Sequence, residues 1–450
     1  MAAGVESAVE SVEIEAFSTE IPSLIPMSKT LYSLAQDRFT KVPVSFQTYA
    51  NGASRPSFRV PFRVQGGAAI QQGTGDGSAL GMGNMSVWQD FSLSPVWNFS
   101  VNQMSHLSQL AVNGKKRGLI SLKAEELKNS LDSTMAGLEG LMYGDGSGLI
   151  TQIATTATVN TTAPGSIVGV RAMAFTDNQI VAFFASEGAA TRGYATVLVN
   201  DPVTSTLYFV GGLVSGSNTL GSNLSSTVVA GDYMMVYGAN GSATAGNGII
   251  GTTGWINSAT SGTIAGINRA TYPSRISSPS INLNGGSVVA SLSQRIEALL
   301  GRAMGGDNKT KDSGIYIFGE DQSLAVAQTN YYNKQITIQQ SSNEGNTGKV
   351  PDVSKKYFQG TFGGRDVHLS YVQPVGRIDM LLTSEWYIGE LCPLQLYDFG
   401  GGNTVMPVPA GTASGGWLTA TQFVYEASFN LACSAPRHQL FVYGASQPTI

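Results

Sequence analysis

Two glycine-rich clusters are the first candidates for chemistry, because such loops can cradle phosphate groups with their backbone N–H groups. They read GTGDGSALG from Gly73 and GDGSG from Gly144. Neither matches G-x-x-x-x-G-K-[ST] or G-x-G-x-x-G, and no lysine lies near either cluster. We therefore interpret the first as a plain loop and the second as the end of a helix.

The other residue types that carry catalysis are scattered. The three histidines, His106, His368 and His438, show no metal-ligand spacing, and the sequence contains no HExxH. No serine lies in G-x-S-x-G, and no aspartate-rich calcium loop is present. We interpret each histidine as a packing or surface residue. The sequence therefore predicts a protein that is not an enzyme and that holds no cofactor and no metal.

A pair of arginines stands out in the stretch AGINRATYPSR, from Ala265 to Arg275. The 97 residues before Arg269 contain only five charged side chains. Guanidinium groups in such a region suit charge-assisted hydrogen bonds to carboxylates or carbonyls at a domain or subunit boundary. Solvated surface arginines are the alternative. Tyr272 precedes Pro273, which favours extended geometry at the tyrosine and a fixed crossing of the chain here.

Composition limits the class of protein. The chain has 450 residues, which predicts two or more lobes. Only 12% of the residues are charged, about half the usual ~25%, and 54 are glycine. A surface so poor in charge suggests cover by further copies of the chain, with a secreted β-rich protein as the alternative. The net charge of −4 and the lack of a basic stripe argue against sequence-specific nucleic-acid binding but allow a container for nucleic acid.

The compartment follows from the cysteines and the N-terminal residues. Cys392 and Cys433 lie in apolar contexts, so we expect buried, reduced thiols. The first residues, MAAGVESAVESVEIEAF, lack the basic and apolar regions of a signal peptide. No apolar run reaches the ~18 residues that span a bilayer. We expect a protein of a reducing cytosol, or of a particle assembled there, without a membrane.

Two segments alternate apolar and polar residues with the period of a β-strand, SFRVPFRVQ from Ser57 and FSLSPVWNFSV from Phe91. Pro61 and Pro95 confine both to edge positions. We predict one long hairpin with a glycine-rich tip, whose apolar face lies on another subunit because no partner strand is evident nearby. The candidate interface residues of this region are Arg59, Arg63, Trp88 and Trp97.

A helix is predicted from Ser121 to Tyr143, because apolar residues recur there every three or four positions. At about 1.5 Å per residue it would be a strut over 30 Å long. Residues 154–262 predict a small β-domain, with a hairpin in GYATVLVNDPVTSTLYFVGG and a strand in AGDYMMVYGANG. A helix from Val288 to Met304, the strand GIYIFG and two strands around Ala435-Pro436 follow.

The order of these parts resembles major capsid proteins of tailed bacteriophages with the Hong Kong 97 fold. The segments LEGLMYGDGSG, VAGDYMMVYG and AGINRATYPSR carry the likeness, and FGGRDVHLS and MLLTSEWYIGELCPLQLYD add to it. The resemblance implies an α+β chain with an inserted small β-domain. Its parts would be an N-terminal arm (1–40), an extended hairpin or E-loop (41–111), the spine helix of the P-domain (112–153), the inserted β-domain (154–262), and an A-domain with return strands to the P-domain (263–450).

The resemblance also implies a function. Pentamers and hexamers of the chain would close into an icosahedral shell around double-stranded DNA, which is contacted non-specifically. The interface candidates would then include Arg269, Tyr272 and Arg275. Portal, scaffolding and decoration proteins are possible partners, and the location would be the virion, assembled in the host bacterial cytoplasm. The alternatives are an encapsulin-like nanocompartment shell, which usually lacks a large inserted domain, and a secreted β-rich adhesin or hydrolase.

Overall fold

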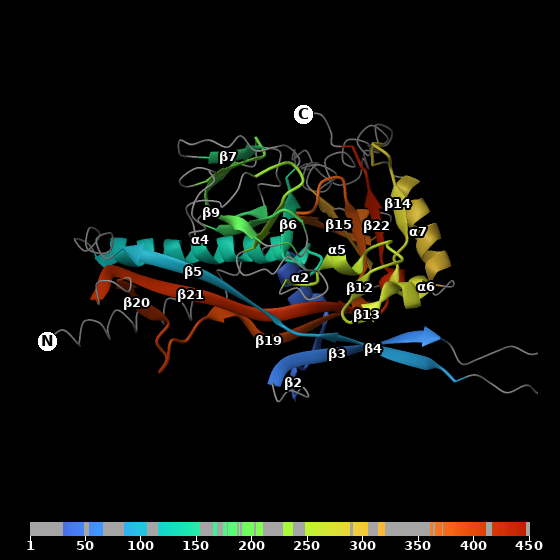
Figure 1. The fold of residues 1–450 in the computed structure, drawn as a ribbon, viewed down its shortest axis with the longest axis horizontal. Helices are drawn as coiled ribbons and strands as arrows, with labels where there is room; N and C mark the ends of the chain where they lie inside the picture. Colours follow the sequence, from blue (N-terminus) through green and yellow to red (C-terminus); the bar gives the residue numbers. More distant parts are fainter. Residues whose placement is uncertain are drawn as a thin grey trace, which may run out of the picture.

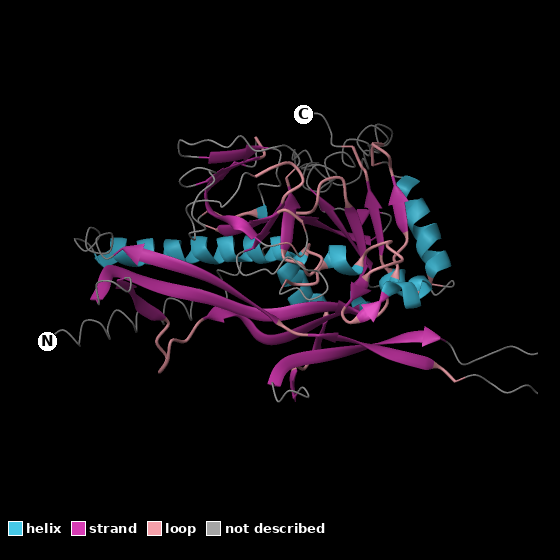
Figure 2. Ribbon diagram, viewed as in Figure 1, coloured by secondary structure: helices cyan, strands magenta, loops and turns pink. Residues whose placement is uncertain are grey.

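A long helix, a long sheet beneath it and a projecting hairpin set the shape of the chain (Figure 1). Strands predominate and helices are few, so the class is α+β (Figure 2). The computed structural model describes residues 30–48, 54–65, 85–105, 116–153, 165–168, 174–177, 179–186, 189, 191–201, 204–209, 228–236, 248–288, 291–304, 314–319, 361–362, 365–370, 372–410 and 416–446. Among these residues, no helix is both long and apolar enough to cross a membrane.

The long helix α4 runs from Lys116 to Met142, five residues earlier than its predicted start. The predicted apolar stripe is confirmed, since Leu131, Met135, Leu138 and Met142 are all buried. The helix ends as predicted before Gly144, whose N–H donates to the carbonyl of Leu141 at 2.9 Å.

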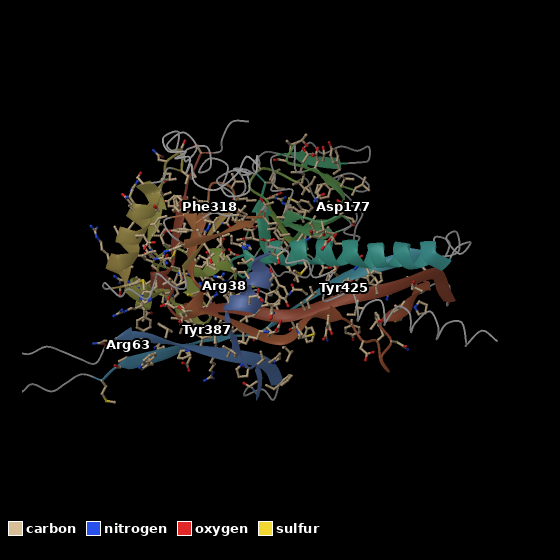
Figure 3. The ribbon with its side chains drawn as sticks, turned by 180° about the vertical axis from the view of Figure 1, so that it is seen from behind. Arg38, Arg63, Asp177, Phe318, Tyr387 and Tyr425 are labelled. Carbon is tan, nitrogen blue, oxygen red and sulfur yellow. The ribbon has the colours of Figure 1, made fainter. Side chains whose placement is uncertain are left out.

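The long sheet lies under α4 and is antiparallel except for its first pair of strands. Its central strand β21 pairs with β19 and β20 on one side and with β5 on the other, while β1 extends β19. The bounds are β1 (Thr40–Val42), β5 (Val96–Ser105), β19 (Trp386–Leu396), β20 (Val405–Ala410) and β21 (Gly416–Cys433). The hydroxyl of Tyr425 on β21 donates to the carbonyl of Leu127 at 3.1 Å, which ties the sheet to the helix (Figure 3).

A short helix, α2 (Leu31–Arg38), packs against α4 and the long sheet. Leu31, Tyr32 and Ala35 are buried, and the Tyr32 hydroxyl donates to Glu390 at 3.1 Å. The arm predicted for residues 1–40 therefore does not extend through this segment, because its apolar residues find a partner surface in the body. The residues before Thr30 lie outside the described part of the chain.

An upright sheet stands at the end of the molecule from which the hairpin projects (Figure 1). The strand order is β14-β22-β18-β15-β17-β16. The bounds are β14 (Ser280–Asn282), β15 (Gly314–Gly319), β16 (Thr361–Phe362), β17 (Arg365–Ser370), β18 (Ile378–Leu382) and β22 (Leu440–Tyr443). Helix α7 (Ser291–Ala303) covers the sheet with Leu292, Ile296 and Leu300. The predicted helix and the predicted strand GIYIFG are confirmed.

A small sheet lies on the other side of α4 from the long sheet (Figure 1). Its order is β6-β11-β8-β9-β10-β7. The bounds are β6 (Leu149–Gln152), β7 (Gly165–Val168), β8 (Ile180–Phe184), β9 (Thr191–Asp201), β10 (Thr206–Phe209) and β11 (Tyr233–Val236). The predicted hairpin, β9 with β10, and the predicted strand β11 are confirmed.

The chain segments that precede and follow the small sheet meet beside the end of α4. The N–H of Gly248 donates to the carbonyl of Gly146 at 3.2 Å, and Asp145 bridges to Ile250. The chain then returns to the body well before residue 262, the predicted boundary. In α5 (Thr252–Trp255), the buried indole of Trp255 donates to the carbonyl of Leu431 on β21 at 3.0 Å.

The projecting hairpin consists of β3 (Ser54–Gln65) and β4 (Val87–Leu93), with β2 (Ser45–Thr48) beside β3. The predicted second strand, residues 91–101, is divided at Pro95, so the prediction of one continuous hairpin strand is wrong. Residues up to Leu93 pair with β3, and those from Val96 pair with β21. Proline has no N–H for the ladder, and β21 supplies a long partner strand that is distant in sequence.

Short elements link α5 to the upright sheet along the chain and form hydrogen bonds with the hairpin. They are β12 (Thr263–Ile264), β13 (Ile267–Asn268), the 3₁₀ turn η2 (Arg269–Thr271) and α6 (Pro273–Ile276). Two further 3₁₀ turns, η3 (Thr383–Glu385) and η4 (Pro436–His438), join strands of the long and upright sheets.

Candidate subunit interface and the mount of the hairpin

The apolar face of the hairpin is buried within its own chain. Phe58, Val60 and Phe62 of β3 and Phe91 and Leu93 of β4 are all buried. Phe91 meets the ring of Trp255 edge-on at 4.9 Å between centroids and stacks with Phe62 at 4.3 Å. The prediction that this face lies on another subunit is therefore wrong. Its partner was not evident because Trp255 is more than 160 residues away in sequence.

A glycine of the long sheet makes room for the base of the hairpin. A Cβ atom at Gly389 would lie 2.2 Å from the ring of Phe58. No side chain fits in that space without moving the ring, since real Cβ contacts are longer. The hairpin is thus fitted to β19 at one defined position.

Arg269 is buried and bonds to backbone carbonyls of its own chain. It donates to the carbonyl of Ile276 at 3.1 Å and to that of Gly254. Burial lowers the pKa of Arg269 to about 10, which still leaves the guanidinium charged at neutral pH. Of the two partner types expected for this arginine, it uses carbonyls, and it joins α5 to the segment that carries the hairpin.

Tyr272 and Arg275 hold the hairpin to this segment. The side-chain amide of Gln89 donates to the Tyr272 hydroxyl at 2.9 Å, and Arg275 Nε donates to the carbonyl of Val64 at 3.0 Å. Tyr272 has φ −134° and ψ 53°, so the extended geometry expected before proline is not fully adopted, because the next residue, Pro273, begins α6. Sequence analysis predicted these residues at a domain or subunit boundary. In the structure they join the hairpin to the short segment that begins α6.

The opposite face of the hairpin carries Arg59, Arg63 and Trp88, all exposed (Figure 3, which labels Arg63). Arg63 and Trp88 are directly paired across the two strands, so they share this face. Trp88 leaves 59% of its surface open. Single exposed hydrophobic residues are normal, but an exposed tryptophan beside arginines has the composition of an interface hot spot.

Trp97 lies outside the hairpin, on β5 of the long sheet. It stacks with Phe99 at 5.9 Å between ring centroids, and the two are 47% and 56% exposed. Tyr397 contacts Phe99 edge-on at 6.4 Å and is itself partly open. We call Trp97, Phe99, Val101 and Tyr397 the aromatic row. Among the interface candidates proposed from sequence, only Trp97 belongs to this row, although the same alternating segment also includes Phe99 and Val101.

Asn430 is a structural residue that sequence reasoning missed. It is buried on β21, donates to the carbonyl of Ser94 at 2.9 Å and accepts from the N–H of Ile250 at 2.9 Å. It thereby fixes the chain between hairpin and β5 and the chain returning from the small sheet. A lone amide inside the apolar strand SFNLAC was the available signal.

The residue types that sequence analysis tested for chemistry lie apart from one another in the described part of the chain. No group of three or more His, Cys, Asp and Glu side chains is placed there to hold a metal. His438 Nδ1 lies 2.6 Å from Glu385, His368 lies on β17, and His106 and the cluster from Gly73 fall outside the described residues. Cys392 and Cys433 are buried free thiols, as predicted. Burial, with Glu426 nearby, raises the pKa of Cys392 to about 11.

Comparison with known proteins now places this α+β arrangement in a class. No family model matches the sequence, and no curated protein matches it. The capsid asymmetric unit of cyanophage A-1(L) is similar in structure, at 11% identity and a TM-score of 0.50, with 93% of this chain and 94% of that chain covered. The chain has the fold of a phage capsid protein.

Two further solved structures are similar to the chain at lower scores. The capsid of a native GTA particle gives 9% identity and a TM-score of 0.43, with 92% of this chain and 90% of that chain covered. Gordonia phage Cozz gives 10% identity and a TM-score of 0.41, with 92% and 86% covered.

Proposed function

We propose that the chain is the major capsid protein of a tailed bacteriophage, assembling as pentamers and hexamers into an icosahedral shell around double-stranded DNA. The observation that carries this proposal is the shared fold with a cyanophage capsid subunit over more than nine tenths of both chains. In this proposal the role of the protein is structural: its shape and its contacts with other copies form the shell, without catalysis and without a cofactor.

The Hong Kong 97 layout assigns a role to each part. In this proposal the hairpin with β2 is the E-loop, α4 with the long sheet is the P-domain, and the upright sheet with α7 is the A-domain. The small sheet, residues 149–236, is an inserted domain. This division ends the N-terminal arm at Thr30 and the insertion before Gly248, in accord with the packing of α2 and α5 in the body.

Adjacent copies would cover the surfaces that one copy leaves open. The hairpin face with Arg59, Arg63 and Trp88 and the aromatic row with Trp97 are the two candidates. Both expose aromatic rings, and buried aromatic rings dominate the energetics of most interfaces. Arg269, Tyr272 and Arg275 would act indirectly, by setting the angle at which the hairpin leaves the body.

The remaining partners follow from a shell of this kind. Packaged DNA would be contacted non-specifically, since the chain carries a net charge of −4. Portal, scaffolding and decoration proteins are further partners, and the location is the virion, assembled in the cytoplasm of a host bacterium.

Negative-stain microscopy of the expressed full chain tests the proposal. Closed, uniform shells are the expected result, and a soluble monomer at all concentrations would contradict it. Shells that enclose protein cargo would instead support the nanocompartment alternative. On a denaturing gel the shells should give a single band at the chain mass of 47.2 kDa, because no lysine lies between Lys41 and Lys115 to form a covalent link to a neighbour.

A further inference from the structure

Helices α6 and α7 lie at the end of the molecule from which the hairpin projects (Figure 1), and together with η4 they carry four arginines. Arg275 is on α6, Arg295 and Arg302 are on α7, and Arg437 is on η4. Both α6 and α7 contact η4, and the Arg437 guanidinium donates to the carbonyl of Ser274. We call these four residues the arginine end.

Helix α7 turns its arginines to solvent. Its apolar residues Leu292, Ile296 and Leu300 are buried in the upright sheet. Arg295 and Arg302 are both exposed and are seven residues apart, so they lie on one face about 10 Å from each other. The helix therefore offers two positive charges in a row to whatever covers it.

The carboxylate of α7, Glu297, and that of η3 beside η4, Glu385, are already engaged. Glu297 accepts two bonds from Arg365, at 2.7 and 2.8 Å, and Glu385 lies 2.6 Å from His438. Among the described residues, no carboxylate oxygen lies within 4 Å of any of the four arginines. The arginine end is thus a positive surface on a chain whose net charge is negative, and it suits an acidic partner.

The chain itself contains a segment of the matching charge. Residues 1–28 contain five glutamates and no lysine or arginine; the glutamates are Glu6, Glu10, Glu13, Glu15 and Glu20. An extended chain covers at most about 3.3–3.6 Å per residue, so this length can span up to about 90 Å. The segment can therefore reach a surface far from α2, on its own or on an adjacent copy.

We propose that the arginine end binds the glutamate-rich N-terminal segment of this chain, residues 6–20. The contact is electrostatic and lies outside the interfaces assigned above to the hairpin and the aromatic row. Exposed charge pairs are individually weak, so binding relies on several pairs together and weakens as salt increases.

Photo-crosslinking of the full chain tests this proposal. With Ile14 replaced by p-benzoylphenylalanine, irradiation at low salt should link the segment mainly to peptides containing residues 273–304 and 434–440. R295Q/R302Q should lower the yield of these links about five-fold, because half of the charges are removed. R38Q/K41Q removes the same charge from another exposed site and should leave the yield unchanged.

A charge exchange separates direct contact from damage to the fold. R295E/R302E should abolish the links, and adding E13K/E15K should restore them to within about two-fold of the parent. Links that map elsewhere, or that persist in R295Q/R302Q, would overturn the proposal. It would also fail if no links form and R295Q/R302Q instead releases bound DNA at lower salt, since nucleic acid would then be the occupant. Shell formation, scored separately by microscopy, tests the proposed function and not this contact.

Discussion

The hairpin and strand β5 are successive stretches of chain, separated only by Ser94 and Pro95, and both alternate apolar and polar residues. In the hairpin the apolar face from Phe58 to Phe62 and from Phe91 to Leu93 is buried, whereas on β5 Phe99 is 56% exposed and Trp97 is 47% exposed. Alternation thus tells which residues share a face of a sheet, but it does not tell what covers that face. In the hairpin, Trp255 packs on Phe91 and Gly389 lies against Phe58. In the aromatic row, the described residues leave about half of the surface of Trp97 and Phe99 open.

The largest effect on the free energy of unfolding should follow from truncating a buried ring of the hairpin. Phe91→Ala removes a ring that contacts Trp255 and Phe62, so we expect a loss of about 3–5 kcal/mol in the free energy of unfolding. Phe99→Ala is the matched control and should cost less than about 1 kcal/mol, because its ring is half in solvent. Urea unfolding of the unassembled subunit measures both. Equal losses would show that the aromatic row is buried within one subunit.

The two arginines of AGINRATYPSR allow the same comparison of a buried with an exposed side chain, now for charged groups. Arg269→Ala leaves two buried carbonyls without their charged donor, and we expect a loss of about 1.5–3 kcal/mol. Arg275→Ala removes one exposed bond to the hairpin and should change the free energy of unfolding by less than about 0.5 kcal/mol. Thermal melting of the two variants compares them directly. A parent-like melt for Arg269→Ala would mean that its bonds contribute nothing to folding.

The aromatic row should matter for assembly and hardly for the subunit. Trp97→Ser is expected to change the unfolding free energy by about 0.5 kcal/mol or less, as exposed surface changes usually do. Shell formation should nevertheless require a protein concentration at least several-fold higher, since an interface aromatic is lost in every copy. Light scattering during assembly gives this concentration. Unchanged assembly by Trp97→Ser would leave the row without a role between subunits.

A chemical probe gives the smallest perturbation. Cys392, Ser428 and Trp97 are cross-strand neighbours in one row of the long sheet, yet Cys392 is buried. Its raised pKa, about 11 against an ordinary 9.0, leaves about one thiol in a thousand ionised at pH 8 instead of about one in ten. In Cys433→Ala, alkylation should be at least about a hundred-fold slower in the folded chain than in urea, and should accelerate with pH towards 11. Rapid alkylation of the native chain would show that this side of the sheet opens.

Sequence predicted what is local. The stripe of α4, the pair β9 and β10, and α7 all follow from spacing within one segment, and each was found close to its expected bounds. It could not predict contacts that join distant segments. The bonds of the Asn430 amide and the division at Pro95 both depend on segments far along the chain, which periodicity does not pair. Sequence could suggest which residue types would form an interface. Which face of a sheet each residue lies on could be read only from the register of the strands.

The meeting of Gly146 and Gly248 beside the end of α4 has a consequence for how this chain tolerates added length. Whatever lies between two points that are already held together forms a closed loop, and doubling such a loop costs only about 0.6 kcal/mol of closure entropy. The body should therefore accept longer or shorter sequences at this site with little change in its own stability. For engineering, the chain between these two glycines is therefore a suitable insertion site, where a foreign peptide or a whole folded domain could be displayed on every copy.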